Sequence, residues 1–158
     1  MKTIEIRPAV PGDEGTILGF IKGLADYEHM SGDVVATEEL LREWIFEKQK
    51  AEVLIAVLDG EEVGFALFFH NFSTFLGRAG IYLEDLFVLP ERRGQGVGKA
   101  LLRRIAQIAV ERGCGRLEWS CLDWNKPSID FYLSLGATPM DEWTTYRLTG
   151  ETLLRMAE

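Results

Sequence analysis

LFVLPERRGQGVGKA, residues 86–100, leads from an extended segment through a glycine-rich loop directly into a helix. The loop holds three alternating glycines between basic neighbours at Arg92, Arg93 and Lys99. The first amides of a helix lack internal partners and point outward at the positive end of its dipole, and glycine lets an anion approach such backbone closely. The segment therefore predicts an anion-binding loop that opens a helix.

Two common phosphate-binding patterns fit this loop poorly. The P-loop pattern G-x-x-x-x-G-K-[ST] requires glycine where Arg93 stands and Ser or Thr where Ala100 stands, so it is excluded. The dinucleotide pattern G-x-G-x-x-G, started at Gly94, meets Lys99 in place of its third glycine. Glu118, about 20 residues further on, keeps that pattern open as an alternative. A glycine-rich turn that binds nothing is the other alternative.

Hydrophobic periodicity places regular elements on both sides of the loop. Alternating or β-forming runs predict strands at residues 2–7, 53–58, 63–72, 79–88, 117–122 and 144–148. Helical spacing predicts helices at residues 13–28, from 37 onward, 97–112, 127–135 and 151–156. We expect the helix that follows residue 37 to bury Leu40, Leu41, Trp44 and Ile45.

The order of these elements predicts the fold class. Three consecutive strands joined by tight turns, one of them at Asp59-Gly60, form an antiparallel meander. Each of the next two strands is reached through a helix, which is typical of right-handed parallel crossovers. We therefore expect one α/β domain, residues 1–158, with a mixed central sheet (antiparallel meander plus βαβ) flanked by helices.

Composition limits the function. A chain of 158 residues is about one domain long, and its formal charge of −8 argues against nucleic acid, whose phosphates require a basic face. No apolar run approaches the roughly 18 residues of a membrane span, and the N-terminus shows no signal-peptide pattern, so we expect no membrane contact and a cytoplasmic location. The two cysteines and two histidines lack the spacing of metal ligands, so we expect no metal.

A second motif lies downstream of the loop. Residues 125–136, NKPSIDFYLSLG, fit the pattern N-x-x-[AS]-x-x-[FL]-Y-x-x-x-G. Together with R-x-x-G-x-G at Arg93, Gly96 and Gly98, this resembles the GNAT superfamily of N-acetyltransferases. The resemblance implies the GNAT fold and an acetyl-CoA cosubstrate, with pyrophosphate on the glycine loop and pantetheine hydrogen-bonded to the preceding strand. The cofactor-binding residues expected on this ground are Leu86, Phe87, Val88, Arg93, Gly94, Gln95, Gly96, Val97, Gly98, Lys99, Asn125, Lys126, Pro127 and Ser128.

Tyr132 is the candidate proton donor. Asn125 and Tyr132 are nearly two helical turns apart, so both can face one side of a helix. A phenol, whose pKa is ordinarily near 10, suits protonation of the CoA thiolate, which is the leaving group of acetyl transfer. The resemblance assigns that role to Tyr132. The alternative is that Tyr132 is a core aromatic residue beside Phe131.

Two adjacent acids, Glu84 and Asp85, lie in the apolar strand before the loop. An alkylammonium must lose a proton before its nitrogen attacks, and a carboxylate, or a water that it holds, accepts that proton. Strand alternation sends Glu84 to the face of Leu86 and Val88, and Asp85 to the opposite face. Glu84 is the catalytic candidate, and structural pairing with an arginine is the alternative for both acids.

Further segments, among them LADYE at 24–28 and YLED at 82–85, resemble the diamine (spermidine/spermine) N-acetyltransferase branch of that superfamily. The resemblance implies a homodimer with substrate sites near the subunit interface. We expect Trp119, Trp124 and Trp143 to lie at that interface. The substrate-binding residues expected on this ground are Tyr27, Glu28, Glu84, Glu118, Trp119, Ser120, Asp141 and Glu142.

These observations predict an acetyl-CoA-dependent N-acetyltransferase that acts on a primary amine of a small di- or polyamine-like substrate, by direct attack in a ternary complex. The alternatives are acetylation of thialysine, of another small amine or of a protein lysine or N-terminus, and a non-catalytic acyl-CoA-binding sensor. The predicted carboxylates favour a small polycationic substrate over a peptide. The presence of both Glu84 and Tyr132 argues against the sensor, because binding of acyl-CoA alone requires neither residue.

Overall fold

A computed structural model describes residues 3–158, so Lys2, at the start of the first predicted strand, lies outside the described residues. The chain divides into two compact units, the first ending at Ser120 and the second comprising Cys121–Glu158.

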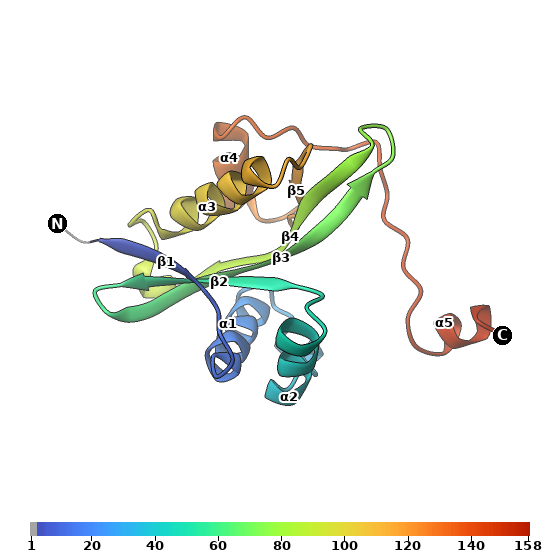
Figure 1. The fold of residues 1–158 in the computed structure, drawn as a ribbon, viewed down its shortest axis with the longest axis horizontal. Helices are drawn as coiled ribbons and strands as arrows, with labels where there is room; N and C mark the ends of the chain where they lie inside the picture. Colours follow the sequence, from blue (N-terminus) through green and yellow to red (C-terminus); the bar gives the residue numbers. More distant parts are fainter. Residues whose placement is uncertain (1–2) are drawn as a thin grey trace. The chain divides into compact units, whose positions relative to one another are not determined.

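The first unit is built on a five-stranded sheet whose strands lie in chain order (Figure 1). Its strands are β1 (Ile4–Pro8), β2 (Glu52–Leu58), β3 (Glu61–Ser73), β4 (Arg78–Val88) and β5 (Leu117–Trp119). β1 to β4 are antiparallel neighbours, and β5 joins β4 in parallel. Asp59 and Gly60 connect β2 to β3 with φ angles of 53° and 78°, as the tight hairpin turn requires. The predicted mixed sheet and meander are confirmed.

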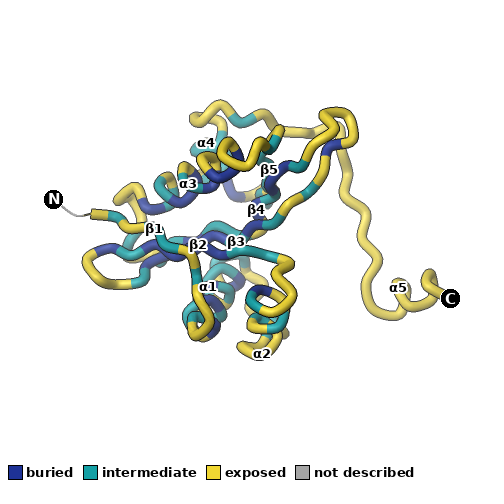
Figure 2. The backbone as a smooth tube through the Cα atoms, in the orientation of Figure 1, coloured by how far each residue is buried: buried dark blue, intermediate teal, exposed yellow. Residues whose placement is uncertain are grey.

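Helices cover both faces of this sheet. α1 (Glu14–Tyr27) and α2 (Glu38–Leu41) lie on one side, and α3 (Val97–Glu111) lies on the other (Figure 1). Short 3-10 turns occupy Ser31–Asp33 and Pro90–Arg92, and a π-helical turn, Arg42–Glu47, continues α2. The buried positions follow the strands and the sheet-facing sides of these helices (Figure 2).

The two faces have separate apolar contacts. On the α1 side, Ile17, Phe20 and Ile45 pack with a group from the sheet that comprises Val53, Ile55, Phe65 and Phe87. On the other side, α3 buries the predicted stripe of Val97, Leu101, Ile105 and Ile108. The stripe is buried because its spacing matches the helical repeat, so one side of α3 faces the sheet along its length.

The helix that begins after Thr37 differs in part from its prediction. The Thr37 hydroxyl accepts from Leu40 N (3.1 Å), as a cap should, and Ile45 is buried. Leu40 and Trp44, however, are 43% and 47% exposed, so their predicted burial is wrong. The π-helical turn widens the repeat beyond 3.6 residues, and the four residues therefore do not share one face.

The second unit contains α4 (Lys126–Ser134) and α5 (Gly150–Met156). The predicted strand at residues 144–148 is wrong, since these residues have no regular structure, and the strand predicted at 117–122 ends at Trp119. A strand needs a neighbour for its backbone hydrogen bonds, and Cys121–Glu158 contains none. Of the two predicted parallel crossovers, only the one through α3 is therefore formed.

No helix within residues 3–158 is both long enough and apolar enough to cross a membrane.

Candidate functional site

One side of β4 is open near its end. β3 pairs with β4 over its whole length, whereas β5 pairs only with Ile81–Leu83. Leu89 N donates to Val63 O of the β3 side (2.9 Å), and backbone groups alternate sides along a strand, so those of Leu86 and Val88 point away from β3. No strand among residues 3–158 pairs with β4 there. The backbone predicted to bind pantetheine therefore has polar groups available for an extended ligand.

A β-bulge interrupts β4 beside this open side. Leu67 lies opposite Asp85 and Phe68 lies opposite Leu83, which leaves Glu84 as an extra residue. The strict alternation predicted for Glu84 is therefore wrong, because the bulge breaks the two-residue repeat between it and Asp85. A single sequence gives no signal for such a bulge.

Three carboxylates gather around the bulge. Burial, and next the charges of Glu84 and Glu28, raise the pKa of Asp85 to about 6. Burial also raises the pKa of Glu28, which directly follows α1. The structure thus brings together two predicted site residues, Glu28 and Glu84, and adds Asp85. An acid in so apolar a strand is the signal that marks Asp85 as a candidate.

The glycine loop has the geometry of an anion site. Gly94 and Gly96 have φ angles of 80° and 85°, in the left-handed region that favours glycine. Gly96 immediately precedes α3, so the unpartnered amides of the first helical turn follow it. A Cβ on Gly98 would meet Val88 Cγ2 at 3.8 Å, which places this helix start against the end of β4. The predicted loop and the open side of β4 are therefore neighbours.

The two arginines of the loop have different surroundings. Arg92 pairs with Glu61. Arg93 Nε donates to Val88 O (3.1 Å), and its guanidinium carbon lies 4.6 Å from the centre of the Tyr27 ring and 5.7 Å from that of Phe87. The Arg93 side chain therefore reaches the end of α1, where Tyr27 precedes Glu28. The sequence placed Arg93 with the cofactor and gave no sign of this contact.

Residues on and after β5 are held by neighbouring strands. Glu118 accepts from Asn71 (3.1 Å) and pairs with Arg116 (3.0 Å), and the Ser120 and Tyr82 hydroxyls lie 2.6 Å apart. Trp119 is half-buried between them. These bonds fix the predicted substrate segment at residues 118–120, and substrate contact there stays a prediction.

The remaining predicted residues lie in the second unit. Asn125 precedes α4, Lys126 pairs with Asp130 (2.8 Å), and the Tyr132 ring lies 5.7 Å from that of Phe131. Pro127 and Ser128 lie in the first turn of the helix, and Asp141 and Glu142 precede α5 in a segment without helix or strand. Tyr132 and Glu84 thus belong to different compact units.

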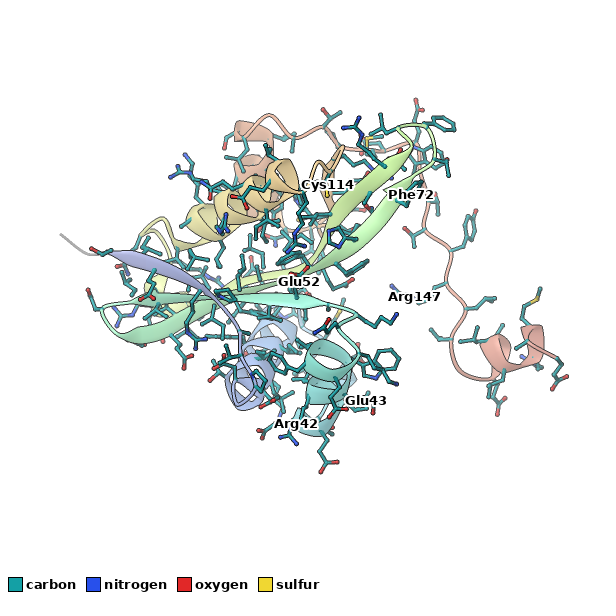
Figure 3. All side chains as sticks on the ribbon, in the orientation of Figure 1. Arg42, Glu43, Glu52, Phe72, Cys114 and Arg147 are labelled. Carbon is teal, nitrogen blue, oxygen red and sulfur yellow. The ribbon has the colours of Figure 1, made fainter. Side chains whose placement is uncertain are left out.

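A cavity of about 620 Å³ lies elsewhere in the first unit, and none of the predicted site residues lines it. Glu52, which is labelled in Figure 3, lies there at the start of β2. It pairs with Arg112, at the end of α3, through contacts of 2.7 and 2.8 Å. Because the two side chains neutralise each other in this ion pair, we do not take the cavity as a candidate functional site. Residues 3–158 contain no group of three or more His, Cys, Asp or Glu side chains that could hold a metal ion.

Comparison with known proteins gives consistent matches. The model of the Acetyltransferase (GNAT) family matches residues 26–137. A thialysine N-epsilon-acetyltransferase of Bos taurus is 39% identical, over 99% of both chains. A human spermidine/spermine N(1)-acetyltransferase-like protein is 33% identical over 99% of this chain and 24% of its own length. Among solved structures, an integron cassette protein from the mobile metagenome of V. cholerae has a TM-score of 0.82 and 29% identity, over 98% of both chains.

Proposed function

The chain belongs to the acetyltransferase (GNAT) family, and from that premise we propose that it transfers the acetyl group of acetyl-CoA to a primary amine of a small di- or polyamine-like substrate. The observation that carries the proposal is the carboxylate group of Glu28, Glu84 and Asp85 at the bulge of β4. Carboxylates attract an ammonium ion, and this group lies beside the open strand side that suits an amide-bearing arm. On this proposal the acetyl donor and the amine acceptor both bind at the same end of β4.

The residues of the first unit fit acetyl-CoA. The left-handed conformation at Gly94 and Gly96 turns backbone amides toward an anion, which suits the pyrophosphate. The carbonyl and amide of Leu86 and the amide of Val88 would pair with the pantetheine as a neighbouring strand does. Asn125 and the first turn of α4, in the second unit, stay predicted cofactor contacts.

Acetyl transfer takes place by direct attack in a ternary complex. The amine nitrogen uses its lone pair to form a bond to the carbonyl carbon of the thioester, and the carbon–sulfur bond breaks. Before the attack, the ammonium passes one proton to a carboxylate. The sulfur leaves as a thiolate and takes the proton of the Tyr132 hydroxyl. The second proton that the nitrogen loses as the amide forms goes to solvent, and solvent returns a proton to Tyr132. Protonation of the thiolate stabilises the leaving group as the carbon–sulfur bond breaks.

Two neighbouring carboxylates are available for the proton of the amine. Glu84 is exposed at the bulge, so it can take the proton directly or through water. Asp85 is ionised at neutral pH, because its pKa of about 6 lies below 7, so it can hold an ammonium ion by charge. We assign Asp85 to hold the ammonium and Glu84 to accept its proton.

A CoA-release assay tests this function. Acetyl-CoA is offered with putrescine, spermidine, spermine, thialysine, lysine and a lysine peptide, and free thiol is measured. We expect turnover of the small amines and little of the peptide. Thialysine is the second candidate acceptor, because it is the substrate named for the relative of Bos taurus. Tight binding of acetyl-CoA without turnover of any amine would instead favour the sensor.

We also propose a homodimer in the cytoplasm. The second unit exposes large apolar side chains, including Trp143 (78%) and Tyr146 (91%), and an exposed apolar surface marks a contact with another chain. Light scattering coupled to size-exclusion chromatography gives the mass directly. A mass of one chain at micromolar concentration would contradict the dimer.

A further inference from the structure

The β-bulge at Glu84 decides on which face of the sheet Tyr82 lies. In a regular strand, residues three apart point to opposite faces, so the sheet would separate Tyr82 from Asp85. Asp85, however, lies opposite Leu67, and Tyr82 lies opposite Phe69. Leu67 and Phe69 alternate by two, and residues directly opposite each other share a face. The extra residue in β4 therefore brings Tyr82 onto the face that carries Asp85.

This is the face that α1 covers. Phe65, which strand alternation places on this face, stacks on Phe20 of α1 with 5.6 Å between the ring centres. His70 points to the opposite side, because its ring contacts Arg112 at the end of α3 (3.3 Å). Tyr82 therefore lies on the same side of the sheet as α1, which ends beside the acidic acceptor site.

Tyr82 and Phe69 form a fixed aromatic surface near that site, and we call these two residues the aromatic platform. Their ring centres are 5.4 Å apart, with an angle of 34° between the rings. The Tyr82 hydroxyl lies 2.6 Å from that of Ser120, so the ring is also held at its far end. Both platform residues are only half-buried, because the part of the β3–β4 hairpin beyond the bulge extends past α1 and α2 (Figure 1).

We propose that the aromatic platform binds the methylene chain of the acceptor, while the reacting ammonium lies among Glu28, Glu84 and Asp85. This inference rests on the proposed function and adds a subsite for the part of the substrate that does not react. The register places the platform about 7 Å along the sheet from Asp85, a span that a chain of several carbons covers. A chain that lies on an aromatic ring is removed from water, and the face of the ring also attracts a cation. The carboxylates hold only the amine end, so selection for chain length falls to the platform.

A series of n-alkylamines tests the platform, because its members share one ammonium and differ only in the number of methylenes. Acetyl-CoA is offered with propylamine, butylamine, pentylamine and hexylamine, and the acceptor KM is measured for each. A fully buried methylene is worth about fourfold in affinity, and a chain on one ring buries about half of its surface. We therefore expect KM to fall about twofold with each methylene and about eightfold across the series.

Variants at position 82 separate the ring from its hydroxyl. Tyr82→Thr removes the ring and keeps a strand-forming residue, so KM should change by less than about twofold across the series. Tyr82→Phe keeps the ring and should retain the fall in KM. Calorimetry on the CoA complex measures the affinities for the same amines without turnover, and the affinity should rise with chain length in the wild type and in Tyr82→Phe alone of these two variants.

Phe72→Ala is the matched control. Phe72, which is labelled in Figure 3, is an aromatic residue of the same hairpin, and its side chain is 62% exposed. It follows His70 by two residues and therefore lies on the opposite face of the sheet from the platform. Phe72→Ala should retain the fall in KM, and urea unfolding establishes that each variant is folded. The comparison of hexylamine with propylamine in the wild type needs no variant, so the test stands even where one does not fold.

Three results would overturn the inference. They are a constant KM across the series in the wild type, a fall that persists in Tyr82→Thr, and a fall that is lost in Phe72→Ala as it is in Tyr82→Thr. A constant KM in the wild type together with a smaller mass of Tyr82→Thr in light scattering would assign the platform to a contact between two copies of the chain. If acetyl-CoA binds and no amine is acetylated, the proposed function fails, and calorimetry still decides whether chain length governs binding.

Discussion

Asp85→Asn is expected to make the protein more stable at neutral pH and less active. The folded-state pKa of Asp85 is about 6, against an ordinary value of 3.8, because of burial first and then the charges of Glu84 and Glu28. Ionised Asp85 is therefore better accommodated in the unfolded chain than in the folded one. The difference between the two pKa values corresponds to about 3 kcal/mol of lost stability at pH 7.5, as an upper figure.

The pH dependence has a defined sign. Below about pH 3 the carboxyl is largely protonated in both the folded and the unfolded state, so it has little effect on stability. Between about pH 4 and 6 the unfolded chain releases its proton first, so stability falls as pH rises, and above about pH 6 the loss is complete. The advantage of Asp85→Asn should therefore be near its maximum at pH 7.5 and below about 1 kcal/mol at pH 4.

Urea unfolding followed by tryptophan fluorescence measures this difference at both pH values. Glu91→Gln is the control, because it removes one negative charge at an exposed position and should show no such dependence. Equal free energies of unfolding for Asp85→Asn and wild type at pH 7.5, or the same gain at pH 4, would refute the burial argument. Acetyl transfer at the wild-type rate and KM would separately remove Asp85 from the amine site.

Three further variants test the other parts of the site. Tyr132→Phe should lower kcat by roughly a hundredfold with little change in acetyl-CoA affinity, and unchanged turnover would remove Tyr132 as the acid. Glu84→Gln should impair kcat or the acceptor KM and move the acidic limb of the pH–rate profile to lower pH, because Glu84 raises the pKa of Asp85; an unaltered profile and KM would exclude it. Gly96→Val should abolish acetyl-CoA binding in calorimetry, because valine disfavours a φ of 85°, whereas Gly19→Ala, with open space around its Cβ, should bind normally. Retained binding by Gly96→Val would refute the loop assignment.

The sequence predicted those elements whose formation depends on residues close together in the chain. The stripe from Val97 to Ile108 is buried because a helical repeat needs only one apolar partner surface. The Asp59-Gly60 turn forms because both residues tolerate a positive φ. The glycine loop combines these two signals, which is why its place before a helix could be predicted.

Features that depend on distant partners could not be predicted in this way. Residues 144–148 have strand-forming side chains, but a strand exists only when another strand pairs with it. The bulge at Glu84 arises from the register between β3 and β4, and the Arg93–Tyr27 contact joins segments 66 residues apart in the numbering. Asp85 was visible as an acid in an apolar strand, but its pKa depends on the burial and the neighbours that only the fold supplies.

The open side of β4 has a consequence for the lifetime of the molecule. An unpaired strand edge is a template on which another extended chain can add, and this is how many aggregates start. Here the template lies beside the buried side chains of Leu83 and Phe87. A bound pantetheine would occupy this open strand side and prevent another chain from pairing with it. The concentration of acetyl-CoA would then affect how fast the protein aggregates as well as its catalytic rate.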